Sequence, residues 1–217
     1  MLSEMLDLFL SSFVETLEMV CIAGLIGGLV GAVLGIVLYI TGRDSVLPNA
    51  PVNRVLGLIV NAVRSVPFII LLVAVIPFTR LVVGSSIGTA AAIVPLTIAA
   101  APFVARLVET ALREIDRGLI EAGQAMGAST WQIVWKILLP EALPGIVAAL
   151  TVTFVSLVGY SAMAGAIGGG GLGDLGIRYG YQRFLPEVML TVVVILIVFV
   201  QLVQSLGDLL VRKLSHR

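Results

Sequence analysis

The chain has 217 residues, of which 59% are hydrophobic and 12% charged, and its formal net charge is zero. Soluble domains are about 45–50% apolar and about 25% charged, so this composition excludes an ordinary soluble protein and predicts that lipid surrounds most of the chain. The zero net charge indicates no nucleic-acid partner. The single cysteine, Cys21, excludes a disulfide framework, and the single histidine, His216, stands second from the end, so we expect no metal site in the interior.

The N-terminal segment carries Glu4, Asp7, Glu15 and Glu18 and no basic residue. This pattern is the reverse of the basic start of a cleaved signal peptide. We therefore expect residues 2–13 to form either an amphipathic helix in the membrane interface or a frayed end.

Five apolar segments follow, each long enough to cross the bilayer as a helix, which takes about 20 residues. They are residues 19–42, 56–79, 82–105, 143–166 and 188–210. These runs are continuous, whereas membrane strands alternate apolar and polar residues. The sequence therefore predicts an all-α membrane protein with five transmembrane helices.

Glycines recur four residues apart in the first of these segments. Gly24 and Gly28 form one row, and Gly27, Gly31 and Gly35 form another. Small residues at this spacing let the backbone of a neighbouring helix approach closely, so the two rows predict helix packing rather than a binding site.

Basic residues predict the orientation of the chain in the membrane. If the N-terminus is outside, ten basic residues lie on the cytoplasmic side and three lie outside, as the positive-inside rule requires. The C-terminus is then cytoplasmic. The inner residues are Arg43, Arg54, Arg64, Arg106, Arg113, Arg117, Lys136, Arg212, Lys213 and Arg217, and the outer ones are Arg80, Arg178 and Arg183.

The third and fourth spans are joined by a long polar loop, residues 109–140, which lies on the cytoplasmic side in this orientation. A simple connector is shorter, so we expect the loop to have a function of its own. Asp116 can cap a short helix over residues 119–126, and Gly127 can end that helix in the left-handed conformation.

A second short helix is predicted in the same loop. Ser129 and Gln132 have the spacing of a capping box, and the helix they start can run to Leu139. Pro140 and Pro144 are expected to break the chain before the fourth span. The two short helices offer apolar side chains for docking, namely Leu119, Ile120, Trp131, Val134, Ile137 and Leu138.

This loop resembles the Glu-Ala-Ala loop of ABC importer permeases. The matching residues, in the family's spacing, are Glu121, Ala122, Gly123, Gly127, Ile137, Leu139 and Pro140. Gly123 is a departure, because the family usually has alanine there, and it should soften the helix by about 1 kcal/mol. The resemblance implies that these residues couple the permease to a separate ATPase subunit, whose motion the loop transmits.

Other segments are similar to the permeases of methionine importers: residues 64–72, 76–80, 92–97 and 157–163. The likeness covers nearly all of residues 1–217, as a single permease domain. It implies a permease homodimer in the bacterial inner membrane, two ATPase subunits that bind ATP and Mg²⁺, and an external methionine-binding lipoprotein. The implied substrate is methionine, in its L- or D-form. Another amino acid or small organic solute is the alternative, since nothing in the composition indicates methionine.

Two features are candidates for the translocation pathway. On the fourth span, Thr153, Ser156, Tyr160 and Met163 fall within an arc of about 80°, a stripe suited to a small zwitterion with an apolar side chain. Their hydroxyl groups could equally make hydrogen bonds between helices. Arg64, in the second span, either contacts the pathway near an inner gate or extends its side chain to the cytoplasmic interface.

Two sequence patterns resemble enzyme motifs but lack the structural elements that those motifs require. Residues 171–176 satisfy G-x-G-x-x-G but follow a membrane span instead of a strand, and residues 84–88 spell G-x-S-x-G without a histidine partner. No P-loop occurs, and the spans hold no paired carboxylates. We therefore expect no catalytic residue and no cofactor on this chain, with ATP hydrolysis on a partner. A structural scaffold would not need the cytoplasmic loop, and an ion-coupled carrier would need intramembrane acids.

Overall fold

The structure is a computed structural model, which describes residues 2–43 and 45–215. His216 and Arg217, which the sequence analysis used, lie outside the described residues. The described part is helical and contains no strand. Its helices are α1 (Leu2–Ile40), α2 (Ala50–Ser65), α3 (Phe68–Ala74), α4 (Ile76–Val83), α5 (Thr89–Arg113), α6 (Arg117–Ala125), α7 (Thr130–Ile133), α8 (Leu139–Ala164), α9 (Gly171–Leu175) and α10 (Pro186–Leu214), with π-helical segments η1 (Val134–Leu138), η2 (Gly165–Gly169) and η3 (Gly176–Tyr181).

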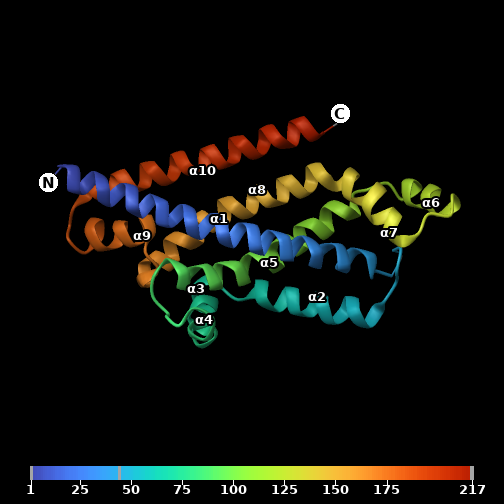
Figure 1. Ribbon diagram of the computed structural model, residues 1–217, viewed down its shortest axis with the longest axis horizontal. Helices are drawn as coiled ribbons and strands as arrows, with labels where there is room; N and C mark the ends of the chain where they lie inside the picture. Colours follow the sequence, from blue (N-terminus) through green and yellow to red (C-terminus); the bar gives the residue numbers. More distant parts are fainter. Residues whose placement is uncertain (1, 44, 216–217) are drawn as a thin grey trace.

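The long helices α1, α5, α8 and α10 lie along one axis and form an elongated bundle (Figure 1). By length and composition, four helical stretches could cross a membrane: Glu4–Ile40, Thr89–Arg113, Thr130–Gly169 and Pro186–Leu214. Helices α2 and α3 together make a fifth candidate, bent by 105°. The prediction of an all-helical membrane protein is confirmed, with four or five apolar spans.

The first helix differs from its prediction. Residues 2–13 are neither a separate interfacial helix nor a frayed end, because α1 is one helix of 39 residues. No proline or glycine interrupts the chain before Gly24. The early turns also have apolar partners: Phe13 stacks edge-on against Phe199 of α10 with ring centroids 5.4 Å apart. Apolar contacts with α9 and the start of α10 thus hold the early turns of α1 against the bundle.

The second predicted span is broken into three helices. Pro67 separates α2 from α3 because it lacks an N–H group and forces the preceding residue out of the helical region. Val66 accordingly has extended backbone angles, φ −84° and ψ 125°. Gly84 then ends α4 in the left-handed conformation, with φ 82°. The third span therefore begins at Thr89 instead of residue 82.

The glycine rows of α1 pack as predicted, one against α5 and the other against α8. A Cβ atom on Gly27 would lie 2.6 Å from the Cβ of Ala100, and one on Gly35 would lie 2.6 Å from the carbonyl oxygen of Ala105. Only glycine permits this approach. The α5-facing row is Gly27, Gly31 and Gly35, and the α8-facing row is Gly24 and Gly28.

Candidate functional site

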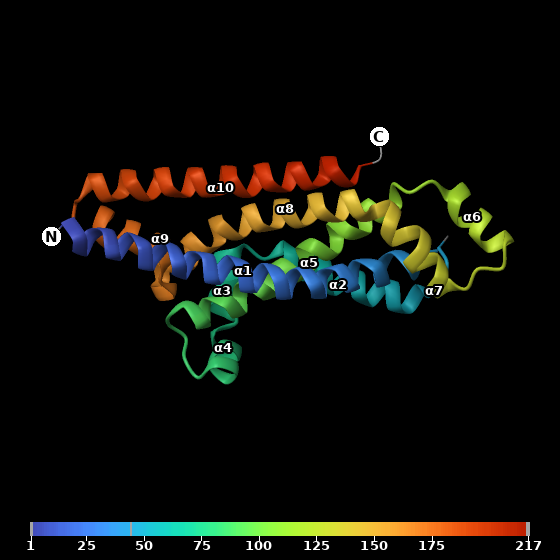
Figure 2. The same cartoon turned by 45° about the horizontal axis from the view of Figure 1, so that its top comes forward.

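The polar loop that was predicted to be cytoplasmic forms two short helices, α6 and α7, at one end of the bundle (Figure 2). Asp116 caps helix α6 as predicted, since its Oδ1 atom accepts a hydrogen bond from the Gly118 N–H at 2.7 Å, but the helix begins at Arg117 instead of residue 119. It ends at a left-handed residue, Gly127, with φ 78°. The Ala128 N–H then bonds the Gly123 carbonyl at 3.0 Å, which closes the helix C-terminus.

The second helix also starts as predicted but does not end there. The Ser129 hydroxyl accepts from the Gln132 N–H at 3.3 Å, and the Gln132 side chain accepts from the Ser129 N–H at 2.9 Å, completing the capping box. The expected break at Pro140 and Pro144 is wrong. Helix α7, segment η1 and helix α8 form one unbroken helical stretch, Thr130–Ala164.

A π-helical turn explains this continuity. In η1 the Leu139 N–H bonds the Val134 carbonyl, five residues back. Pro140 lies in the first turn of α8, and the wider turn before it accommodates the proline ring. The second loop helix is consequently continuous with the helix of the fourth span.

The residues that match the family's loop occupy two layers. Gly123 is buried, and a Cβ atom there would lie 2.7 Å from Ile137 Cδ1, so glycine at this position lets Ile137 pack against α6. Ile137 and Leu139 are half-buried. The remaining members, Glu121, Ala122, Gly127 and Pro140, are exposed. The structure thus separates an inner layer that holds the helices together from an outer layer that a partner could contact.

Two of the apolar side chains that were predicted to be available for docking are buried instead. Val134 and Leu138 are buried in a cluster with residues of α5. Trp131 is 68% exposed, and it stacks edge-on with Trp135 at 5.3 Å. Met126, on the turn after α6, is 82% exposed. Large exposed apolar side chains gathered at one end of a protein indicate an interaction surface.

Glu121 faces a cavity of about 510 Å³ between α1, α5 and α6. Its wall is largely polar. The lining includes Tyr39 and Arg43 near the end of α1, Arg113 at the end of α5, and Arg117 at the start of α6. The cavity therefore joins the loop to the ends of two spans.

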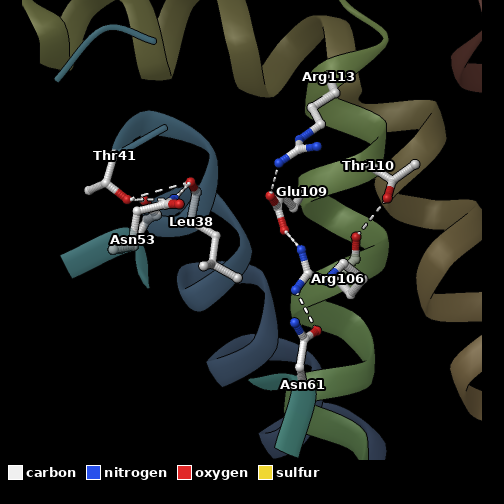
Figure 3. Close-up of polar contacts among 9 residues, drawn as sticks. Leu38, Thr41, Asn53, Asn61, Arg106, Glu109, Thr110 and Arg113 are labelled. Atoms are coloured by element: carbon white, nitrogen blue, oxygen red, sulfur yellow. Dashed lines mark hydrogen bonds and ion pairs between the residues drawn. The ribbon is translucent and has the colours of Figure 1, made fainter. Parts of the chain in front are cut away.

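A network of charged side chains around the buried Glu109 lies next to this cavity and was not predicted from the sequence (Figure 3). Glu109 of α5 has a side chain only 3% exposed. Its Oε2 atom accepts from Arg106 Nη1 at 2.6 Å, and its Oε1 atom accepts from Arg113 Nη2 at 2.5 Å. Arg106 Nη2 also donates to Asn61 Oδ1 of α2 at 2.6 Å. The sequence did carry a signal for it: Glu109 stands three residues after Arg106 and four before Arg113, at the end of an apolar span.

The pathway candidates on α8 do not share one open face. Thr153 is buried, and its hydroxyl donates to the Ala149 carbonyl at 2.8 Å. The hydroxyl of Ser156 donates to the Val152 carbonyl at 2.9 Å. Both bonds stay within the helix, so neither hydroxyl makes the hydrogen bond between helices that was the alternative.

The other candidates are more accessible. Tyr160 is half-buried and stacks on Phe68 of α3 with ring centroids 4.5 Å apart. Met163 is 47% exposed. Arg64 is exposed on the last turn of α2, just before the bend at Pro67. The role of these residues in a pathway stays a prediction.

The glycine-rich segment lies at the end of the bundle opposite the loop, near the N-terminus (Figure 1). Glu15 Oε2 accepts from the Gly171 N–H at 2.6 Å, and Thr16 Oγ1 accepts from the Leu172 N–H at 2.9 Å. Two α1 side chains thus occupy the first donors of α9, and within the described residues no strand precedes it. A packed helix cap explains this glycine pattern.

Comparisons with known proteins agree with this architecture. The family model of the binding-protein-dependent transport system inner membrane component matches residues 27–216. The probable D-methionine transport system permease protein MetI of Vibrio cholerae is 57% identical over 211 residues, covering 97% of this chain and 94% of the relative. The methionine import system permease protein MetP of Bacillus subtilis is 43% identical over 180 residues, covering 83% and 81%.

A solved structure of the MetNI methionine ABC transporter, in inward facing conformations, has a chain that superposes with a TM-score of 0.96. It is 53% identical, and the match covers 98% of this chain and 99% of that one. The resemblance to ABC importer permeases is confirmed, and the protein is a multi-pass transport subunit of the bacterial inner membrane. The chain belongs to the family of binding-protein-dependent transport system inner membrane components.

Proposed function

We propose that this chain is the permease subunit of an ATP-driven importer that carries methionine inward across the inner membrane by alternating access. The observation that carries the proposal is the α6–α7 pair, which presents exposed apolar side chains and continues without a break into α8. The substrate follows from the names of the relatives, which transport D-methionine or import methionine. The same family carrying another amino acid or small solute is the alternative.

The proposed orientation places the N-terminus outside and the α6–α7 pair in the cytoplasm, with residues 1–217 forming a single permease domain. Two ATPase subunits would dock on the pair and bind ATP and Mg²⁺. This chain would bind no cofactor and catalyse no reaction. An external methionine-binding lipoprotein would deliver substrate at the opposite end.

A second copy of the chain is also proposed, because one copy is too open to enclose a pathway. The most apolar part of α10 is only 11% buried. On α8, Val152 is 45% exposed and Met163 is 47% exposed, so this central helix lacks a complete cover. In a two-fold permease dimer, the same face of the second copy would cover this exposed face.

The proposed mechanism uses the continuous helix from α7 to α8. Closure of the ATPases would shift the docked helices, and α8 would rotate with them because η1 keeps the chain helical between the two. Tyr160 and Met163, on the accessible part of α8, would then become accessible to the substrate from the other side of the membrane. Their hydroxyl and thioether groups suit the zwitterion and the side chain of methionine.

Reconstitution tests the proposal. The purified complex in proteoliposomes should accumulate methionine when ATP is present on the side of the α6–α7 pair, and unlabelled L- and D-methionine should compete. Native mass spectrometry should find two permease copies and two ATPases. Accumulation of a different amino acid with no effect of methionine would leave the family assignment intact and refute the substrate.

A further inference from the structure

The buried network on α5 fixes three charged side chains in one arrangement. Both oxygens of Glu109 are used, one by each arginine, and its side chain is 3% exposed. A buried carboxylate without a partner is strongly disfavoured, so Glu109 has to keep at least one arginine, and Arg106 is the more buried of the two, 26% exposed against 66% for Arg113. Charge-assisted hydrogen bonds of this length are also among the strongest in proteins. The cytoplasmic end of α5 therefore carries an ordered group of charged side chains, Arg106, Glu109 and Arg113, which we call the α5 charge cluster.

Helix α2 is attached to the bundle by few elements. Pro67 and the 105° bend separate it from α3, and residues 41–49 separate it from α1. Its apolar anchorage is one small cluster centred on Val60. At its first turns, the Asn53 side chain donates to the Leu38 carbonyl at 2.7 Å. A helix bounded by two breaks with limited contacts can swing as a unit.

The network links this helix to the end of α5 that borders the cavity. At one end, Arg106 donates to Asn61, 45 residues away in sequence and on α2. At the other end, Arg113 lines the cavity that Glu121 of α6 also lines. Figure 3 shows Arg106, Glu109 and Arg113 in this order along α5, with Asn61 of α2 beside Arg106. A continuous chain of polar contacts thus runs from α2 to the wall of the cavity beneath α6.

We propose that Asn61, Arg106, Glu109 and Arg113 are positioning residues that make α2 follow the loop during transport. When the loop moves the cytoplasmic end of α5, the α5 charge cluster moves with it and displaces α2 through the Arg106–Asn61 hydrogen bond. Helix α2 then pivots about the bend at Pro67. This inference rests on the proposed function, since it assigns the parts that transmit the movement.

Variants at Asn61 test the contact without disturbing the buried acid. Asn61 is exposed, so Asn61→Leu removes the acceptor on a helix that tolerates leucine, whereas Asn61→Asp keeps an acceptor for Arg106. Ser65→Ala is the matched control, because the Ser65 hydroxyl lies one turn away and donates within α2 at 2.8 Å. Uptake and ATP hydrolysis are measured on intact complexes in proteoliposomes.

Asn61→Leu should lower substrate transported per ATP hydrolysed by at least about fivefold while the complex still forms and hydrolyses ATP. Asn61→Asp and Ser65→Ala should keep the wild-type ratio. Equal ratios in the leucine and aspartate variants, whether both normal or both low, would overturn the proposal.

A second readout separates this proposal from the identity of the substrate. Leu58 of α2 is 69% exposed, so a single cysteine there, in a Cys21→Ala background, reports the position of the helix. Its reaction rate with a thiol reagent should change with ATP in the wild type and lose that change in Asn61→Leu. An unaltered response in the leucine variant contradicts the transmission even if methionine is not the substrate. Absence of methionine uptake with a normal labelling pattern contradicts only the proposed substrate.

Discussion

Replacing Gly127 by valine is the most direct perturbation of the α6–α7 pair. Gly127 has φ 78°, a region that residues with a Cβ atom disfavour, and a Cβ there would meet nothing within 4 Å. The cost is therefore conformational and not steric crowding against neighbours. Holding an L-residue in the left-handed region costs about 1–2 kcal/mol, and a β-branched residue lies at or above the upper end.

The structure indicates how this strain would be relieved. If residue 127 leaves the left-handed region, the Ala128–Gly123 hydrogen bond of 3.0 Å is lost and the angle between α6 and α7 changes. Met126 and Trp131, on either side of the turn, would then no longer present one surface. The spans should still insert, because their stability depends on lipid and helix packing. We expect a membrane-inserted permease that associates weakly with its ATPase or hydrolyses ATP without uptake.

Uptake and ATP turnover in proteoliposomes measure this directly. Gly127→Asn is the matched variant, because asparagine tolerates the left-handed conformation and should retain most of the coupling. Glu121→Ala, on the exposed side of α6, removes a carboxylate that a partner could contact and leaves the turn intact. Full transport per ATP in Gly127→Val and in Glu121→Ala would refute the assignment of this loop as the coupling element.

Three further changes probe other parts of the fold. Gly35→Leu should lower the stability of the purified protein by about 1–3 kcal/mol, because the leucine would overpack against α5. Gly159→Ala should leave the stability unchanged, because a Cβ atom at residue 159 meets nothing within 4 Å. Thermal unfolding in detergent compares the two variants. Thr16→Val leaves the buried second N–H of α9 unpaired and should cost about 1–3 kcal/mol, seen as faster amide exchange in α9; unchanged exchange would contradict the cap. Cysteine at Met163 should react with small thiol reagents and cysteine at Thr153 should not, since these side chains are exposed and buried; equal reactivity would show that α8 faces the pathway differently.

Local signals predicted the loop well. Asp116, Ser129 and Gln132 act on backbone groups two or three residues away, and Gly127 acts on its own backbone, so the chemistry of each position is sufficient. Apolar length predicted the helical membrane class for a similar reason, because the bilayer imposes it on each segment separately.

The remaining features depend on contacts that are distant in sequence. Proline has opposite effects at two places: Pro67 bends the chain, whereas Pro140 follows a π turn and leaves the helix continuous. The residue alone does not decide between them, because neighbouring helices determine which backbone groups can be left unpaired. The bond from Arg106 to Asn61 could not be predicted, because it forms only when α2 and α5 pack together, whereas the Glu109 pairs with Arg106 and Arg113 had a local signal that was overlooked.

The central claim is that this permease converts ATP hydrolysis into inward movement of methionine. The most direct test is the accumulation of radiolabelled methionine in proteoliposomes that contain the complete complex, followed until the internal concentration is steady. The account predicts accumulation above the external concentration that requires ATP on the loop side and stops when ATP is withheld. Equal internal and external methionine with and without ATP would contradict it.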